Sequence, residues 1–271
     1  MPGLEYTLCA IDLDETLLGP DHHISERNAK AVRAVRDLGV TVVIASGRMH
    51  EATLRYAKEL GLDGPVISYN GALIKIPGTG EEWMHERVPS NVALEIMHYC
   101  GRRKLQLNFY YNGFVHSTED TAWLQLYHAR TGSPYVIEPD MEQAMLGIEP
   151  TKLLIVDTPE YTNSLLPVLR DRYKDVLYVT KSTDEYLEMM PPRANKGAAL
   201  EYAASRLGVV AQQTIAIGDS FNDIPMVKWA GLGLAVGNAK PELLAVADRT
   251  IARSDADGVA QVLEELYQLH F

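Results

Sequence analysis

The sequence predicts an α/β protein: a parallel sheet with helices on both faces, interrupted by an inserted α/β domain with an antiparallel sheet. Short apolar runs at residues 8–11, 42–45 and 214–217 suit strands that are buried on both faces of a parallel sheet. Between about residues 83 and 191 the alternation of strand and helix changes to paired strands with helices. A chain of 271 residues is long enough for two domains. We therefore expect a core from residues 1–82 and 192–271, and an insert from residues 83–191.

The core is expected to alternate strand and helix. Its first strand is the apolar run that ends at Ile11, and its first helix begins after the capping residue Ser25 and closes at Gly39. Further strands are expected at residues 40–45, 65–69, 214–217, 233–236 and 250–251, and further helices at residues 52–60, 196–207, 222–229, 241–246 and 258–269.

The insert is expected to form an antiparallel sheet with helices against it. Its helices are predicted at residues 90–104, 121–130 and 159–173, and its strands at residues 105–110, 113–117, 152–157, 176–180 and 186–190. Alternation along the first of these strands places Leu105, Leu107 and Phe109 on a face that meets the helices, and Gln106, Asn108 and Tyr110 on the opposite, polar face.

Composition and charge narrow the classes of partner. A net charge of -11, with no extended Lys and Arg cluster, argues against a nucleic-acid surface. No apolar run approaches the ~20 residues that span a bilayer, so no membrane partner is expected. Cys9 and Cys100 are expected to be buried thiols rather than a disulfide, and a cytoplasmic location is the expectation that follows.

Two carboxylates follow the first predicted strand directly. Asp12 and Asp14 lie two residues apart, so an extended strand would point them the same way. Because ligands of parallel sheets bind beyond the carboxyl ends of the strands, the pair indicates either a magnesium site or an acid and a nucleophile with separated pKa values. A solvated acidic turn is the alternative that the pair alone leaves open.

A second acidic cluster favours the functional interpretation. Asp219 and Asp223 follow the predicted strand 214–217, Ser46 follows another strand, and Lys196 begins a helix. Carboxylates, a hydroxyl group and a lysine that converge on one sheet edge suit phosphate chemistry. Ser46 has no surrounding nucleophile elbow, so its hydroxyl is expected to donate to a phosphate rather than to attack a substrate.

These segments, taken together, resemble the motifs of the haloacid dehalogenase (HAD) superfamily in its Cof-type sugar phosphatase branch. The matching segments are Asp12-Leu13-Asp14-Glu15-Thr16, Ser46-Gly47-Arg48, Asn70-Gly71-Ala72, Lys196-Gly197, Gly218-Asp219 with Asn222-Asp223, Gly237-Asn238-Ala239 and Asp257-Gly258-Val259-Ala260. The resemblance implies a Rossmann-like core and makes the insert a cap domain that selects the substrate. Asn70-Gly71 also fits a hairpin turn, and both interpretations stand.

The resemblance also implies roles for single residues. Asp12 would attack phosphorus, and Asp14 would protonate the leaving oxygen and later activate water. Magnesium would bind Asp12, the main-chain carbonyl of Asp14, and Asp219, with Asp223 in support. The remaining predicted phosphate-binding residues are Ser46, Gly47, Arg48, Asn70, Lys196 and Asn222. The sequence departs from the family pattern at Ser46, where threonine is commoner, and at Leu244, where lysine is common.

The function expected from these features is a magnesium-dependent phosphatase of small phosphorylated metabolites, sugar phosphates in particular, acting through an aspartyl phosphate. A phosphosugar mutase that uses the same intermediate is the first alternative, and a non-catalytic phosphometabolite-binding protein is the second. In the cap, the polar face with Asn108 and Tyr110 is expected to be available to the leaving group of the substrate, and an ordinary solvated sheet face is the alternative.

Overall fold

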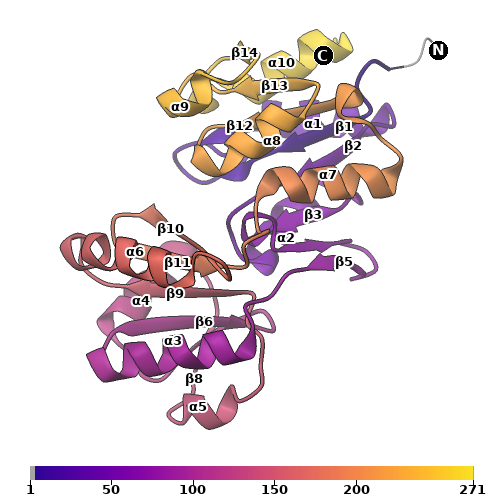
Figure 1. Ribbon diagram of the computed structural model, residues 1–271. Helices are drawn as coiled ribbons and strands as arrows, with labels where there is room; N and C mark the ends of the chain where they lie inside the picture. Colours follow the sequence, from indigo (N-terminus) through magenta and orange to yellow (C-terminus); the bar gives the residue numbers. More distant parts are fainter. Residues whose placement is uncertain (1–3, 271) are drawn as a thin grey trace. The chain divides into compact units, whose positions relative to one another are not determined.

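The computed structural model describes residues 4–270, which form two compact units. The core unit contains the described residues up to Met84 and from Asn195 onward, and the inserted unit contains residues His85–Ala194. Both units are α/β in character, as the sequence predicts (Figure 1).

A five-stranded, all-parallel sheet organises the core unit, in the order β14-β13-β12-β1-β2 (Figure 1). This confirms the predicted parallel sheet. Its strands are β1 (Leu8–Ile11), β2 (Thr41–Ile44), β12 (Thr214–Gly218), β13 (Leu232–Ala235) and β14 (Arg249–Thr250). Because β1 lies between β12 and β2 in register, the chain segments that follow these three strands emerge at one edge of the sheet.

Helices with identifiable end signals cover this sheet. The Ser25 hydroxyl accepts a hydrogen bond from the Asn28 backbone at the start of α1, and the side chain of Asn195 does the same for Ala198 in α7. Gly61 ends α2 in the left-handed region, with φ 67°. The helices are α1 (Glu26–Asp37), α2 (His50–Leu60), α7 (Lys196–Leu207), α8 (Ile224–Trp229), α9 (Pro241–Leu244) and α10 (Gly258–Tyr267).

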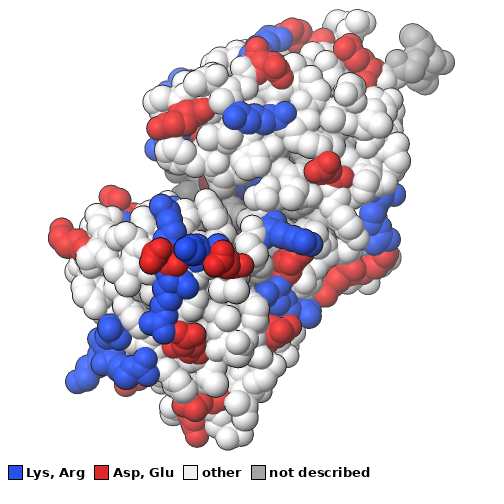
Figure 2. Space-filling model, viewed as in Figure 1, with Lys and Arg blue, Asp and Glu red and all other residues white. Residues whose placement is uncertain are grey.

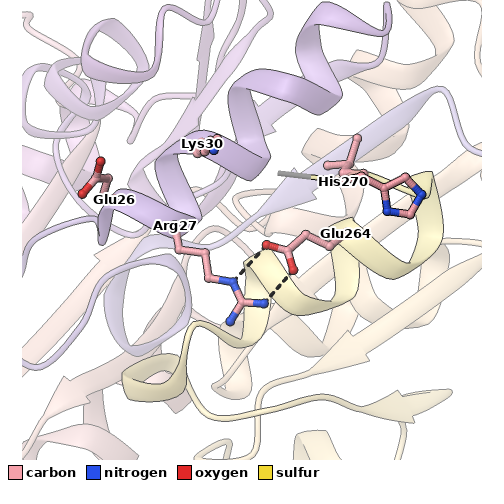
Figure 3. Close-up of a pocket in the computed structure, with 6 residues that line it drawn as sticks. Glu26, Arg27, Lys30, Glu264 and His270 are labelled. Carbon is pink, nitrogen blue, oxygen red and sulfur yellow. Dashed lines mark hydrogen bonds and ion pairs between the residues drawn. The ribbon is translucent and has the colours of Figure 1, made fainter.

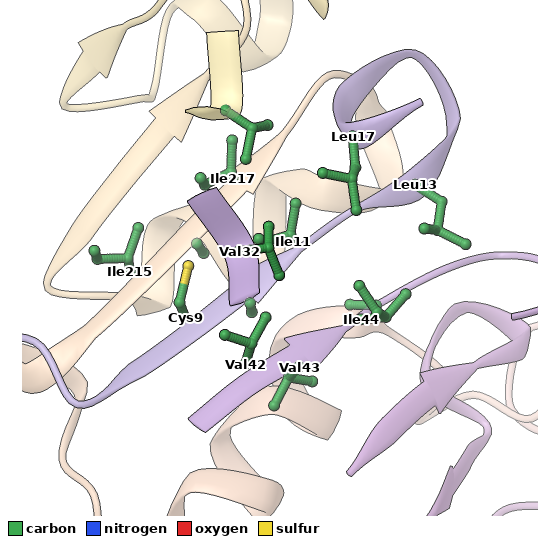
Figure 4. Packing of buried hydrophobic residues seen from close by; sticks show 14 of the residues in the cluster. Cys9, Ile11, Leu13, Leu17, Val32, Val42, Val43, Ile44, Ile215 and Ile217 are labelled. Carbon is green, nitrogen blue, oxygen red and sulfur yellow. The ribbon is translucent and has the colours of Figure 1, made fainter. Parts of the chain in front are cut away.

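The core of this unit is packed around β1. Cys9 and Ile11 are fully buried, and aliphatic side chains from β2, β12 and α1 surround them (Figure 4). Both cysteines of the chain are buried and unpaired, as predicted. Burial raises the pKa of each thiol to about 12.

The segment after β1 differs from the expected strand extension. The strand ends at Ile11, and Leu13–Leu17 form a tight, kinked turn in which Asp14 and Glu15 are not helical and Glu15 has a φ of 57°. Asp14 therefore lies in this turn and not two positions along a strand from Asp12. The expectation that strand alternation brings the two carboxylates together is wrong, because the chain turns before the second carboxylate is reached.

A β-hairpin follows α2, of which the sequence analysis predicted only the turn at Asn70-Gly71 and the first strand. Strands β3 (Val66–Ser68) and β4 (Leu73–Lys75) pair antiparallel around a 3₁₀ turn at Tyr69–Gly71, and β5 (Glu82–His85) extends this small sheet. Asn70 and Gly71 both have positive φ, of 56° and 99°. The hairpin interpretation of Asn70-Gly71 is therefore confirmed.

The inserted unit contains a six-stranded sheet in the order β10-β11-β9-β6-β7-β8, antiparallel except for the β7–β8 pair. Its strands are β6 (Gln106–Tyr111), β7 (Phe114–Ser117), β8 (Tyr135–Ile137), β9 (Lys152–Val156), β10 (Tyr178–Thr183) and β11 (Tyr186–Met190). Its helices are α3 (Ser90–Arg103), α4 (Ala122–Thr131), α5 (Met141–Ala144) and α6 (Pro159–Tyr173).

The two faces of β6 have different surroundings. Leu107 and Phe109 join a buried cluster with residues of α3 and α6, as the alternation predicted. On the other face, the buried Tyr110 hydroxyl donates a 2.6 Å hydrogen bond to Tyr127 of α4, and Thr121 donates to Gln106. The expectation of an uncovered polar face is therefore wrong at these positions, because α4 supplies partners for them.

Among the residues described, no helix has the length and apolar character to cross a membrane.

Candidate active site

Three buried carboxylates gather at the end of the parallel sheet. Asp12 follows β1, Asp219 follows β12, and Asp223 ends the short 3₁₀ turn after Asp219. One oxygen of each carboxylate lies within 4.8 Å of the others. Gly218 allows this close approach, since a Cβ atom at this position would lie 2.5 Å from the Cβ atom of Asp223. The sheet register therefore places the two acidic segments of the sequence side by side.

Lys196 joins two of these carboxylates. Its ammonium nitrogen Nζ lies 2.5 Å from Asp12 Oδ1 and 2.6 Å from Asp223 Oδ1, and the side chain is fully buried. The second oxygen of Asp223 accepts hydrogen bonds of 3.0 Å from the backbone N–H groups of Asp219 and Ser220. Every polar atom of the Asp223 carboxylate is thus used to hold the cluster, which suits a supporting residue.

Burial and charge set the electrostatics of this cluster. Burial raises the pKa of Asp12 well above its usual range and outweighs the opposing effect of Lys196. Burial and then the Asp223 charge raise the pKa of Asp219 to about 7, although Thr16, whose hydroxyl lies 3.4 Å away, opposes the shift. Burial alone lowers the pKa of Lys196, but the Asp12 and Asp223 charges more than reverse this effect and raise it overall.

The donor set fits a hard divalent cation. Three ionised carboxylates and one ammonium group carry a formal charge of -2, which a divalent cation would neutralise. All donors in the cluster of the described residues are oxygen atoms, with neither cysteine nor histidine among them. Oxygen donors suit magnesium or calcium rather than zinc. The observed cluster therefore could hold a metal ion at the predicted residues Asp12, Asp219 and Asp223.

Asp14 lies apart from this cluster and is paired with Arg48. Nε and Nη2 of Arg48 donate to the two carboxylate oxygens of Asp14, at 2.8 and 2.5 Å. The buried Ser46 hydroxyl accepts a 3.1 Å hydrogen bond from the Arg48 backbone. Sequence reasoning placed Arg48 with the phosphate and did not foresee its pairing with Asp14.

The other predicted phosphate-binding residues form a second contact. Asn222 donates a 2.9 Å hydrogen bond from Nδ2 to Oδ1 of Asn70. A Cβ atom on Gly47 would lie only 2.8 Å from the same oxygen, so this glycine lets the segment after β2 approach Asn70. The structure thus brings together side chains that lie 152 positions apart in the sequence.

Two residues to which the sequence gave no role stabilise the turn that carries Asp14. Asn238 donates a 2.8 Å hydrogen bond to the carbonyl of Glu15, the residue with positive φ. Tyr56 of α2 accepts from Arg48 and donates to the carbonyl of His22. Asn238 belongs to a motif that the sequence analysis identified. Tyr56 lies on a predicted helix, where the sequence pattern indicates burial but no functional role.

A shallow hollow elsewhere in the core unit does not compete with this site. It is lined by Glu26, Arg27 and Lys30 of α1 with Glu264, Leu269 and His270 near the end of the chain (Figure 3). The Arg27 guanidinium and the Glu264 carboxylate face each other there and form two hydrogen bonds of 2.9 and 2.6 Å. These two charges therefore neutralise each other.

The fold and the carboxylate–lysine cluster define an α/β protein with a site suited to phosphate chemistry, and comparisons with known proteins identify its family. A family model described as haloacid dehalogenase-like hydrolase matches residues 9–263, so the chain belongs to this family. The predicted family is therefore confirmed.

Relatives and solved structures agree with this assignment. HMP-PP phosphatase of Cronobacter sakazakii (strain ATCC BAA-894) is 32% identical over 88% of this chain and 86% of its own. The 5-amino-6-(5-phospho-D-ribitylamino)uracil phosphatase YcsE of Bacillus subtilis (strain 168) is 31% identical over 96% and 95%. The crystal structure of TM0651 from Thermotoga maritima matches with a TM-score of 0.89 at 32% identity, over 96% and 97%. The predicted enzyme class, a phosphoric monoester hydrolase, is confirmed.

Proposed function

We propose that the protein is a magnesium-dependent phosphatase that hydrolyses small phosphorylated metabolites through an aspartyl phosphate at Asp12. The observation that carries this proposal is the cluster of Asp12, Asp219 and Asp223 around Lys196, buried at the end of the parallel sheet. It combines a nucleophile, cation ligands and a fixed positive charge, which are the groups that phosphoryl transfer requires.

In the first step, a carboxylate oxygen of Asp12 forms a bond to phosphorus while the bond from phosphorus to the ester oxygen breaks. Lys196 binds Oδ1 of Asp12, so the second oxygen is the one assigned to attack. Asp14 gives its proton to the departing alcohol oxygen. In the second step, Asp14 takes a proton from water, the water oxygen attacks phosphorus, and the bond to Asp12 breaks. Inorganic phosphate is released and both carboxyl groups return to their starting states.

The remaining residues bind and orient the transferred group. The Ser46 hydroxyl and Lys196 are assigned to the phosphoryl oxygens, with Gly47, Asn70 and Asn222 shaping the neighbouring wall. Magnesium, held by Asp12, Asp219, the carbonyl of Asp14 and the support of Asp223, would supply positive charge that shields the phosphate from the carboxylates.

We assign the insert, residues 83–191, as a cap that selects the leaving group. Three buried polar side chains on its sheet, those of Asn108, Lys152 and Glu188, support a hydroxyl-rich substrate such as a sugar phosphate. Lys152 and Glu188 form a buried 3.0 Å ion pair, and neither Glu188 Oε2 nor Asn108 Nδ2 has a hydrogen-bond partner among the described residues. An acceptor and a donor left without partners match the hydroxyl groups of a polyol. The YcsE relative is named for a phosphoribityl substrate of this chemical kind.

A nucleic-acid substrate does not fit the charge of the protein. The net charge is -11, and Figure 2 shows basic and acidic side chains interspersed on the visible face. A phosphodiester backbone would require a continuous basic surface.

A screen of phosphorylated metabolites with magnesium, measuring phosphate release, tests the proposal. Hydrolysis of one or more sugar phosphates is expected from the parent protein, with none from Asp12→Asn or in excess chelator. Phosphate release that persists in Asp12→Asn would exclude the aspartyl phosphate. Isomerised sugar phosphate that appears only with a bisphosphorylated sugar would identify a mutase instead.

A further inference from the structure

We propose that Arg48 and Tyr56 act as positioning residues for Asp14, so that Arg48 acts on the leaving group through Asp14 and not on the transferred phosphate. This inference rests on the proposed role of Asp14 as the proton donor. It replaces the sequence-based prediction that Arg48 binds phosphate.

The Arg48–Asp14 contact is bidentate. Nε donates to Oδ2 at 2.8 Å and Nη2 donates to Oδ1 at 2.5 Å, so the guanidinium and carboxylate planes are held by two parallel hydrogen bonds. A planar fork of this kind fixes both the position and the rotation of a carboxylate, which a lysine at the same position could not do.

Asp14 requires such a support because its side chain is partly exposed, although the backbone of its turn is hydrogen-bonded. It lies in the turn Leu13–Leu17, beside Glu15 with its positive φ, and 43% of its side chain is exposed. Among the described residues, the hydrogen bonds to its carboxylate both come from Arg48, and the exposed His22 lies further away, with Nδ1 3.7 Å from Oδ1. Without them, an exposed carboxylate would sample several rotamers, and proton transfer requires hydrogen-bond reach of the leaving oxygen.

Tyr56 completes the arrangement. Its side chain is almost fully buried in α2, and its hydroxyl accepts a 3.2 Å hydrogen bond from Nη1 of Arg48. The same hydroxyl donates to the carbonyl of His22 at 3.2 Å. Arg48 is also anchored at its backbone, by hydrogen bonds to Ser46 Oγ and from the N–H group of Tyr69.

The consequence concerns where Arg48 can act. Nε, Nη1 and Nη2 each donate to a group of the protein, two to Asp14 and one to Tyr56. Three of the five N–H groups of the guanidinium are used in this way, and a phosphate that took the fork of Nε and Nη2 would have to displace Asp14. Lys196, by contrast, lies directly against the nucleophile Asp12. The geometry thus assigns Lys196 to the phosphoryl group and Arg48 to the proton donor Asp14.

Leaving-group dependence distinguishes the two roles. We compare the parent with Arg48→Met, Tyr56→Phe and Asp14→Asn on p-nitrophenyl phosphate, whose leaving group needs no proton, and on an alkyl phosphate such as glycerol 3-phosphate. Arg33→Met, which removes an exposed arginine of α1 bound to the carbonyl of Glu59, is the matched control.

Arg48→Met is expected to lose kcat on the alkyl ester by roughly 10²–10⁴-fold, as does Asp14→Asn, and to lose far less on the aryl ester. Tyr56→Phe removes the hydroxyl that accepts from Arg48 and Arg55 and donates to the His22 carbonyl. This variant is expected to lose about fivefold, with the same preference for the aryl ester. The double variant with Asp14→Asn and Arg48→Met is expected to lose no more on the alkyl ester than Asp14→Asn alone.

Suppose that Arg48→Met loses the same activity on both esters and has a raised KM, while Asp14→Asn keeps its leaving-group preference. This result would show that Arg48 binds phosphate and would overturn the inference. If Asp14→Asn itself loses the same activity on both esters, the proposed role of Asp14 as the proton donor is wrong. Should Arg48→Met not fold, Tyr56→Phe decides: no difference between its losses on the two esters overturns the inference.

Discussion

Replacing Lys196 with methionine tests whether this lysine is the counter-charge of the cluster. Methionine keeps most of the side-chain volume but removes the ammonium that lies between Asp12 and Asp223. Loss of one partner from a buried ion pair costs about 3–5 kcal/mol, a large fraction of the ~5–15 kcal/mol by which proteins are stable. We therefore expect the free energy of unfolding of Lys196→Met to fall by about 3–5 kcal/mol at pH 8 in the presence of chelator.

The pH dependence of this loss follows from the carboxylates. Burial already raises the pKa of Asp12, and removing the opposing charge of Lys196 raises it further. A raised folded-state pKa leaves stability intact at low pH and removes it as pH rises, so the penalty of the substitution shrinks as pH falls and the carboxylates take up protons.

Urea unfolding followed by tryptophan fluorescence and circular dichroism measures the effect. Lys228→Met, an exposed lysine of α8, is the matched control and is expected to change stability by less than about 0.5 kcal/mol. The double variant Asp12→Asn with Lys196→Met should be less unstable than the sum of the two single losses, because the groups interact directly. A Lys196→Met protein as stable as the parent at pH 8 would show that the lysine does not neutralise the cluster.

Three further predictions concern the cation, the thiols and the cap. The pKa of Asp219 is raised to about 7, so the stability that its protonated form contributes is complete below about pH 4 and is lost as pH rises through 7. Magnesium competes with the proton for this carboxylate. The rise in Tm on adding magnesium should therefore be larger at pH 8 than at pH 5.5. An equal rise at both values would contradict metal binding at this carboxylate. Burial raises the pKa of Cys9 and Cys100 to about 12, so Ellman's reagent should label the native thiols roughly 10³-fold more slowly than the unfolded chain, and equal rates would refute their burial. Glu188→Gln should change the order of preference among sugar phosphates, and an unchanged order would remove Glu188 from the cap proposal.

Elements with local end signals could be predicted closely from the sequence. The helix Lys196–Leu207, the helix Pro159–Tyr173 and the strand Tyr186–Met190 have the predicted bounds, and the structure shows Asn195 and Gly208 at the two ends of the first. The strands of the central sheet were recognisable because burial on both faces demands continuous apolar runs. The strand Leu73–Lys75 was missed, since three residues are too few to show a period.

The geometry of the candidate site was predictable only in part. The carboxylates that follow neighbouring parallel strands had to converge, because the sheet brings the strand ends to one edge. The position of Asp14 was not predictable, since the strand ends at Ile11 and the chain has entered the turn Leu13–Leu17 before Asp14 is reached. The contact of Arg48 with Asp14, 34 positions away, depends on a side-chain conformation that tertiary packing sets and no local pattern encodes.

Trapping the aspartyl phosphate tests the central proposal most directly. The enzyme is mixed with magnesium and a rapidly hydrolysed substrate, quenched in acid during turnover, and treated with borohydride, which reduces an acyl phosphate to an alcohol. Peptide mass spectrometry is expected to find homoserine at position 12 in the parent protein and unmodified asparagine there in Asp12→Asn. Phosphate release by the parent without any reduced residue at position 12, or with the reduction at another carboxylate, would contradict the role of Asp12 as the nucleophile.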